Sequence, residues 1–470
     1  MLVQCPDADI RRLANCFDSG LGKTTLRKKL ICRRSDLDFR ISHHNGRAIT
    51  LLPLVPNLYR TGSAVNKASI KETASHSIDF NELRRYRLSR IQAQLQENDF
   101  GAALLFEPQN IRYATDISNA NLIWTFYTPV RYAFVPATGL PILFEYGLDT
   151  CPLSADDYAF VGDIRPSISL ATFYRLNAKD EWIGKWCDQM MGLLAELCGG
   201  SQRLAVDSLV PTACLALANR GIQVFDGDGL MARARLIKCA DEIKCLQAAV
   251  DVADLGARRI REKIRPGVTE QQLWSVLHQT NIEQGGEWIE TQLLSSGQRT
   301  NPWYQTASEK VIADGDLVVF DTDMVGPFGY VGDISRAFLC GDRPNADQRE
   351  AYRVAYDTLQ HNIEVFRPGI SFRELAEQCF LIPEPYRDHQ EAIGHGAGVQ
   401  IEFPLLCQRD EIERMPYPEM LLQPGMVICA EAYAGKAGGT VGVKLEEQLV
   451  ITSDGCELLS RTPFDERCLA

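Results

Sequence analysis

The sequence predicts an α+β protein in which an N-terminal α/β domain is followed by a second domain built on a mostly antiparallel sheet. Two observations support this fold class. Helical and strand-like segments alternate over residues 79–232, and strands joined by Gly-rich turns alternate with amphipathic helices over residues 233–470. A chain of 470 residues with 45% apolar content is also long enough to form two ordinary domains.

The first 78 residues are expected to form an irregular N-terminal extension. Residues 1–75 contain 13 Lys or Arg against 6 Asp or Glu, and their hydrophobic pattern is poor. The stretch FDSGLGKTTLRKKL (17–30) resembles a phosphate-binding loop, but Phe17 stands where that loop requires its first glycine. No apolar strand leads into the stretch either, so we predict no nucleotide site here.

The elements of the α/β domain follow in order along the chain. NELRRYRLSRIQAQLQENDF (81–100) has apolar residues at helical spacing, which predicts an amphipathic helix. GAALLF (101–106) is typical of a short buried strand. RYAFVPATGLPILFEY (131–146) predicts two strands about a Gly-Leu-Pro turn.

The second domain is predicted to open with two helices. Apolar residues recur at helical spacing over residues 241–264, and Pro266-Gly267 ends this helix. Thr269 then begins another helix, because Gln272 three residues later completes a capping box.

Composition excludes several classes of partner. The net charge of −12 offers no basic surface for nucleic acid, and no uninterrupted apolar run approaches the roughly 20 residues that span a bilayer. The 15 cysteines are scattered without a CxxC pair, which favours free thiols in a reducing compartment. We therefore expect a cytoplasmic protein that acts on a small-molecule substrate.

Three aspartates interrupt two strand-like runs in VVFDTDMVGPFGYVGDISRAF (318–338). Side chains alternate along a strand, so Asp321 and Asp323 are expected to project from one side, about 7 Å apart. Asp333 follows a Gly-Pro-Phe-Gly turn and can lie on the neighbouring strand. Buried carboxylates cost several kcal/mol each unless a positive charge or hydrogen bonds compensate them.

Three further residues share these surroundings. Glu431 and Glu446 each end a short apolar strand that follows a glycine, and His395 lies among small residues in GHGAGV. Each acid taken alone fits a surface strand residue, and the histidine alone fits a structural role. Together, five carboxylates and one imidazole suit two divalent ions of Mn, Fe, Co or Zn better than Ca or Cu.

These motifs resemble a known superfamily. The order Asp, Asp, His-Gly-x-Gly, Glu and GVKLE is similar to that of the pita-bread metalloenzymes, which include methionine aminopeptidase, prolidase, aminopeptidase P and creatinase. The resemblance covers about 79–470, with a creatinase-like N-terminal α/β domain before a pita-bread catalytic domain. SSGQRTNPWYQ (295–305) and VGDISRAFLCGDRP (331–344) look most like the dimethylsulfoniopropionate lyases of the DddP type.

The resemblance implies a metal site, a reaction and an assembly. By position, the implied metal ligands are Asp321, Asp323, Asp333, His395, Glu431 and Glu446. The implied reaction is β-elimination of dimethylsulfoniopropionate to dimethyl sulfide and acrylate. The superfamily also implies a homodimer in which the N-terminal domain of one subunit helps to close the active site of the other.

Three positions depart from the relatives that the chain resembles. Trp303 replaces a histidine of the peptidases, and its face suits a sulfonium or quaternary ammonium group, so we predict that it binds substrate; a packed core tryptophan is the alternative. Ile401 replaces the proton-abstracting aspartate of the lyases, and Gln390 replaces a tyrosine. Glu402 and His389 are then the candidate bases.

Three functions remain open at this point. The first is a metal-dependent lyase acting on dimethylsulfoniopropionate or a close analogue. The second is a metal-dependent hydrolase of C–N bonds, of the creatinase and aminopeptidase P type. The third is a non-catalytic binding protein with the same fold, which the apolar Ile401 favours and the six ligand positions oppose.

Overall fold

The computed structural model describes residues 68–118, 129–147, 155, 158–171, 179–387, 392–414 and 418–470. These residues belong to one compact unit, Ala68–Ala470. Most of the expected N-terminal extension, including the stretch at 17–30, lies outside the described residues. The part of it that is described holds α2 (Ile70–Ser75), and the domain boundaries at 78 and 232 stay predictions.

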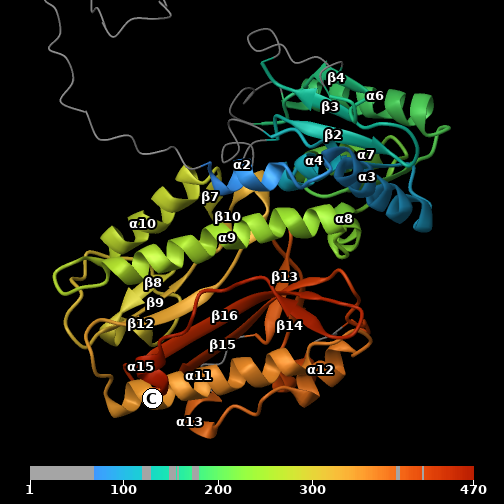
Figure 1. Cartoon of the computed structure of the whole chain (residues 1–470). Helices are drawn as coiled ribbons and strands as arrows, with labels where there is room; N and C mark the ends of the chain where they lie inside the picture. The colour runs from blue at the N-terminus through green and yellow to red at the C-terminus, as the bar shows by residue number, and fades with distance from the viewer. Residues whose placement is uncertain are drawn as a thin grey trace, which may run out of the picture. The chain divides into compact units, whose positions relative to one another are not determined.

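The N-terminal half is built on a six-stranded mixed sheet in the order β4-β3-β2-β1-β5-β6 (Figure 1). β1 pairs antiparallel with β2 and parallel with β5, which makes this an α/β arrangement. The strands are β1 (Ala102–Leu105), β2 (Tyr132–Pro136), β3 (Ile142–Glu145), β4 (Asp163–Pro166), β5 (Arg203–Val206) and β6 (Gln223–Asp226). The helices are α3 (Phe80–Glu97), α4 (Pro108–Thr115), α6 (Lys179–Leu197), α7 (Pro211–Ala218) and α8 (Gly227–Arg235).

Local sequence explains how this half begins. The side chain of Asp79 accepts hydrogen bonds from the backbone N–H groups of Asn81 and Glu82, and so caps the first turn of α3. All four residues of β1 are buried, because this strand lies inside the sheet with neighbours on both sides. The helix at 81–100, the strand at 101–106 and the two strands at 131–146 are confirmed.

The second half opens with the two predicted helices, α9 (Ala240–Lys263) and α10 (Glu270–Glu283). α9 carries acidic residues in its first turn and basic residues in its last, which complements the helix dipole. Thr269 and Gln272 form the expected capping box at the start of α10. α9 also packs closely on β11, since a Cβ at Gly332 would lie 2.4 Å from the Ala249 carbonyl oxygen.

Two three-stranded sheets and one five-stranded sheet complete this half, with the orders β11-β10-β7, β12-β9-β8 and β14-β13-β15-β16-β17. Every pairing in them is antiparallel, as predicted. The strands of the smaller sheets are β7 (Trp288–Ile289), β8 (Leu294–Ser296), β9 (Leu317–Asp321), β10 (Met324–Val325), β11 (Val331–Gly332) and β12 (Ser335–Leu339). Those of the larger sheet are β13 (Gly394–Ala397), β14 (Ile401–Leu406), β15 (Val427–Gly435), β16 (Gly442–Ile451) and β17 (Cys456–Leu458).

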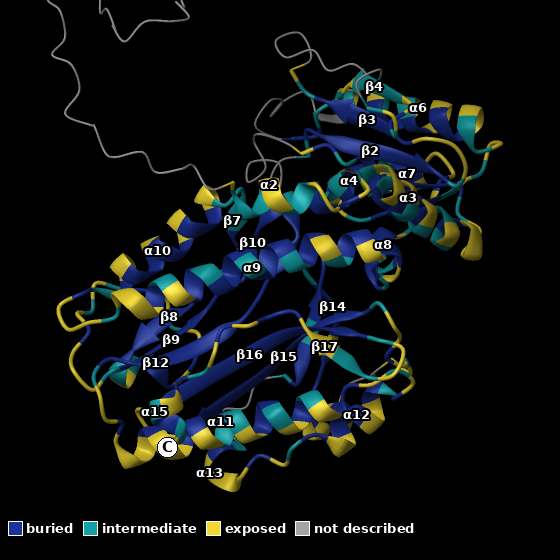
Figure 2. Cartoon of the chain, viewed as in Figure 1, coloured by how far each residue is buried: buried dark blue, intermediate teal, exposed yellow. Residues whose placement is uncertain are grey.

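Helices cover these sheets on both sides. α11 (Ala346–Val365) packs on β15 and β16 from one side, and α9 lies on the other side (Figure 1). The remaining helices are α12 (Phe372–Gln378), α13 (Glu384–Arg387), α14 (Arg409–Ile412) and α15 (Glu466–Leu469). All residues of β9, β12, β15 and β16 are therefore buried (Figure 2).

Both predicted strands that carry the aspartates are interrupted: one between β9 and β10, the other between β11 and β12. β9 ends at Asp321, and Asp323 adopts a left-handed backbone with φ of 36° before β10 begins. Asp333 lies in the matching gap between β11 and β12. The expectation that Asp321 and Asp323 share one face of a continuous strand is therefore wrong in its geometry, although the carboxylates still converge.

The side chain of Thr322, in the interruption between β9 and β10, bonds to the backbone on both sides of Asp333. Its Oγ1 donates to the carbonyl oxygen of Gly332 at 3.0 Å and accepts from the backbone N–H of Ile334 at 2.9 Å. These bonds engage the Gly332 carbonyl and the Ile334 N–H where both strands break, so these two backbone groups keep hydrogen-bond partners.

None of the helices in the described part of the chain combines the length and apolar character that crossing a bilayer requires. The described cysteines are free thiols.

Candidate metal centre

Five strand ends or strand faces bring the predicted ligands together. Asp321 ends β9, Asp333 follows β11, and His395 lies on β13. Glu431 on β15 is directly opposite Glu446 on β16. Two carboxylates placed opposite each other in a sheet repel, so this pair requires compensating charge.

The ligand atoms form two overlapping groups, in each of which all atoms lie within 4.8 Å of one another. One group contains Asp321, Asp323 and Asp333. The other contains Asp333, His395, Cys429 and Glu446. Asp333 belongs to both groups, so its carboxylate could contribute a ligand oxygen to either one.

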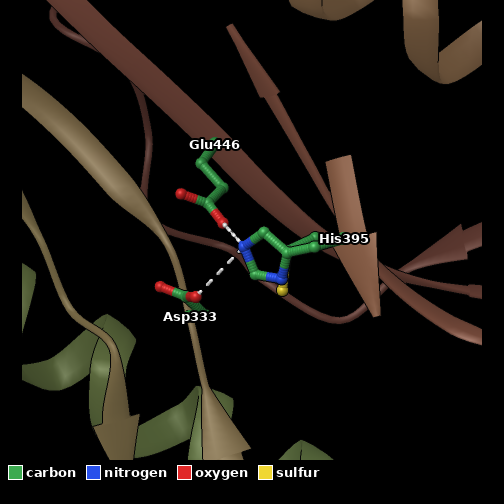
Figure 3. Close-up of side chains that lie close together, drawn as sticks. Asp333, His395 and Glu446 are labelled. Carbon is green, nitrogen blue, oxygen red and sulfur yellow. Dashed lines mark ion pairs between the residues drawn. The ribbon is translucent and has the colours of Figure 1, made fainter. Parts of the chain in front are cut away.

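Asp333, His395 and Glu446 point toward one another from three different strand segments (Figure 3). The Nε2 atom of His395 lies 3.7 Å from Oδ2 of Asp333 and 3.6 Å from Oε1 of Glu446. Both carboxylate oxygens are buried and accept no hydrogen bond. Two buried, unsatisfied oxygens that face one imidazole nitrogen need a cation between them.

An ammonium group already meets part of that charge. Lys444 Nζ lies 2.7 Å from Oε2 of Glu431, 3.1 Å from Oδ2 of Asp321 and 3.3 Å from Oε2 of Glu446. Ser335 also donates to Oε2 of Glu446 at 2.8 Å. One oxygen of Glu446 is thus held by the chain, and the other is left to a ligand.

These charges shift pKa values in opposite directions. Burial raises the pKa of Asp333 well above its usual range, and the Glu446 carboxylate raises it further. Burial would also raise the pKa of Glu446, but Lys444 and His395 lower it to about 2. Burial would lower the pKa of His395, yet Glu446 and Glu431 raise it to about 9. Without bound cations, the repulsion among the carboxylates therefore favours the protonated forms of Asp333 and His395.

The residues fit a metal site. Buried carboxylates and one imidazole are ligands that divalent transition ions accept, and the two unsatisfied oxygens supply lone pairs that no protein donor uses. A divalent ion would also replace the protons, since it carries the charge that the cluster lacks. The chain therefore presents a candidate Asp/His/Glu metal site.

Sequence reasoning missed two members of this cluster. Cys429 and Lys444 each stand two residues before a predicted ligand, Glu431 and Glu446 respectively. Residues two apart on a strand share a face, so the spacing could have identified both. Burial and the surrounding carboxylates raise the pKa of the Cys429 thiol well above its usual range.

Trp303 lies in the core, only 5% exposed, and packs near Tyr433 with ring centroids 6.0 Å apart. Lys444 Nζ lies 5.6 Å from the centroid of the Trp303 ring. The aromatic ring thus already faces a cation of the chain itself. This favours the alternative of a packed core tryptophan over the predicted contact with a substrate sulfonium.

Of the two candidate bases, the structure describes only Glu402. His389 and Gln390 lie outside the described residues. The Glu402 carboxylate is buried, with Arg235 Nε at 2.7 Å from one oxygen and Lys238 Nζ at 2.6 Å from the other. Because both oxygens are engaged, Glu402 fits a structural ion pair better than a proton acceptor.

Known proteins were compared with the chain by sequence. A model of metallopeptidase family M24 matches residues 244–453. The dimethylsulfoniopropionate lyase DddP of Roseovarius nubinhibens is 36% identical over 394 residues, which cover 82% of this chain and 87% of that protein. The Xaa-Pro dipeptidase of Pyrococcus furiosus is 30% identical over 243 residues, covering 50% of this chain and 66% of that protein.

Solved structures show the same fold. The Xaa-Pro dipeptidase from Bacillus anthracis superposes with a TM-score of 0.65 at 24% identity, covering 81% of this chain and 98% of that one. Aminopeptidase P from E. coli gives a TM-score of 0.62 at 19% identity, with 82% and 97% covered. The α+β fold class and the pita-bread resemblance are confirmed. Since the sequence similarity to the Roseovarius protein extends over most of both chains, the chain belongs to metallopeptidase family M24, the pita-bread superfamily.

Proposed function

We propose that this protein is a dinuclear metal-dependent lyase that cleaves dimethylsulfoniopropionate, or a close analogue, to dimethyl sulfide and acrylate by β-elimination. The observation that carries the proposal is the similarity to a dimethylsulfoniopropionate lyase, which is 36% identical and extends over 82% of this chain and 87% of that protein. By contrast, the similarity to the Pyrococcus furiosus dipeptidase covers half of the chain.

The proposed centre holds two ions of Fe, Mn, Zn or Co. Asp321, Asp323, Asp333, His395, Glu431 and Glu446 would be their ligands. Bound divalent ions would supply positive charge that orients a substrate carboxylate and stabilises negative charge developing beside it. Lys444 holds one oxygen each of Asp321, Glu431 and Glu446, and thereby fixes the directions in which their other oxygens point.

Gas-phase detection of dimethyl sulfide tests the proposal. Purified protein is loaded with each metal in turn, incubated with dimethylsulfoniopropionate, and the headspace is analysed. We expect metal-dependent release that a chelator abolishes. The matched control is Asp333→Asn, which removes one charge from the residue shared by both ligand groups. A folded, metal-loaded protein that releases no dimethyl sulfide would contradict the proposal.

A second candidate is a metal-dependent hydrolase of C–N bonds, of the creatinase and aminopeptidase P type. The 30% identity to an Xaa-Pro dipeptidase, together with the apolar Ile401 where the resemblance implies an aspartate, supports it. The same preparations are offered Xaa-Pro dipeptides and creatine, and free amine or urea is measured. Hydrolysis without dimethyl sulfide release would replace the lyase proposal with this one.

We also propose that the protein is a homodimer, as the superfamily resemblance implies. Light scattering coupled to size exclusion measures the molar mass in solution. A value near that of one 52.5 kDa chain would contradict this assembly.

A further inference from the structure

Gln448 holds the backbone around Asp333. It stands two residues after Glu446 on β16, so the two side chains leave the same face of this strand. Its Oε1 accepts a hydrogen bond from the backbone N–H of Asp333 at 2.8 Å, and its Nε2 donates to the carbonyl oxygen of Val331 at 3.2 Å. A single side-chain amide therefore satisfies one backbone donor and one backbone acceptor beside a predicted ligand.

Thr322 holds the same segment with its hydroxyl, through the bonds to Gly332 and Ile334 described above. Thr322 and Gln448 together engage four backbone groups where β11 and β12 are interrupted. Both side chains are fully buried. Water cannot take over a bond that is lost at such a position, so the segment depends on these two side chains.

The position of this backbone decides where the carboxylate of Asp333 points. Its Oδ1 accepts a hydrogen bond from the backbone N–H of Asp323 at 3.1 Å. Its Oδ2 is buried, accepts no hydrogen bond and lies 3.7 Å from Nε2 of His395 (Figure 3). Because an aspartate side chain is short, a shift or rotation of the backbone would carry Oδ2 away from the other predicted ligands.

We propose that Thr322 and Gln448 are positioning residues of the metal centre, which fix the backbone of Asp333 and thereby set the affinity of the protein for both ions. This rests on the two-ion centre of the proposed function, but not on the reaction. Asp333 belongs to both ligand groups, so its displacement weakens the binding of either ion. Loss of a residue that orients a metal ligand typically lowers metal affinity about 10- to 100-fold.

Thr322→Val and Thr322→Ser form a matched pair of variants. Valine has nearly the shape of threonine but lacks the hydroxyl, whereas serine keeps the hydroxyl and lacks only a methyl group. Metal-free protein is titrated with Co²⁺, and binding is followed by calorimetry and by the visible absorption spectrum, which reports the ligand geometry around cobalt. We expect Thr322→Val to raise both Kd values about 10- to 100-fold and to change the spectrum. Thr322→Ser should stay close to the wild-type protein.

Gln448→Met tests the second residue. Methionine has a similar length, but it can make neither of the two hydrogen bonds of the amide, so it should weaken Co²⁺ binding as Thr322→Val does. Thr358→Val is the control for stability. Thr358 is also buried, and its hydroxyl donates to the carbonyl oxygen of Val354 within α11. This variant should lower the Tm and leave both Kd values for Co²⁺ unchanged.

Wild-type Kd values in Thr322→Val or in Gln448→Met would overturn the role of that residue, even if the Tm fell. Weaker binding of only one ion would overturn the assignment to Asp333, and Thr322→Ser that binds as weakly as Thr322→Val would overturn the role of the hydroxyl. If Gln448→Met does not fold, the two Thr322 variants decide. A wild-type protein that binds Co²⁺ as expected but releases no dimethyl sulfide would overturn the lyase function alone. A wild-type protein that binds no Co²⁺ would overturn both proposals.

Discussion

The ammonium of Lys444 lies 2.7 Å from the carboxylate of Glu431, inside the cluster of acids that would hold metal ions. Five carboxylates at the centre carry up to five negative charges. Two divalent ions would contribute four positive charges, and Lys444 would contribute the fifth. The chain therefore supplies the one charge that a pair of divalent ions would leave unbalanced.

Replacing the Lys444 ammonium should destabilise the metal-free protein more than the metal-loaded protein. Lys444→Met leaves three buried carboxylates without their shared partner, and removing one member of a buried ion pair costs about 3–5 kcal/mol. Urea unfolding in a chelator measures the loss of free energy of unfolding, which metal loading should partly restore. Lys436→Met is the control, because Lys436 pairs with Glu350 in an exposed setting and should lose about 1 kcal/mol or less. Equal losses in the two variants would contradict a special role for Lys444.

Glu446→Ala should reduce the metal content of the protein. The residue offers the centre a buried oxygen that accepts no hydrogen bond, so its removal deletes a ligand. Elemental analysis of the purified variants should find less than the wild-type stoichiometry. Glu457→Ala changes an exposed glutamate on β17 and should leave the metal content unchanged. Full metal occupancy in Glu446→Ala would show that the ligand assignment is wrong.

The metal-free protein should lose stability as the pH rises from about 6.5 to 9. The folded pKa of His395 is raised from 6.5 to about 9, so its contribution is complete below 6.5 and disappears as the pH passes 9. The shift corresponds to about 3 kcal/mol, and the raised pKa of Asp333 acts in the same direction. Denaturant unfolding at several pH values measures the slope.

His395→Asn should flatten that slope, whereas His361→Asn, at an exposed position, should leave it intact. Bound metal should flatten it in the wild-type protein as well, because the ion replaces the proton on the imidazole. A metal-free protein whose stability does not change over this range would contradict the shift.

Glu402→Gln should unfold more easily but keep its metal. The neutral amide leaves Arg235 and Lys238 buried without their counter-ion, which costs about 3 kcal/mol. Thermal unfolding and elemental analysis together separate stability from ligand loss. Glu419→Gln, at an exposed position, provides the control. A Glu402→Gln protein with wild-type stability and no elimination activity would instead support a catalytic role for Glu402.

The sequence by itself determined the fold class, the main elements and the predicted ligand set. Periodicity and capping residues act locally, so the helices at α3, α9 and α10 and the hairpin of β2 and β3 were predictable. Acids that end apolar strands pointed to a shared cation for the same reason, since burial makes isolated carboxylates costly.

Only the tertiary structure decided which charged side chains meet. Glu402 looked like a candidate base until Arg235 and Lys238, some 165 residues earlier, were found on its two oxygens. The pairing of β15 with β16 places Lys444 near both the Trp303 ring and the carboxylates of the centre. Electrostatic interactions depend on distance in space, whereas sequence spacing gives that distance only within one helix or strand.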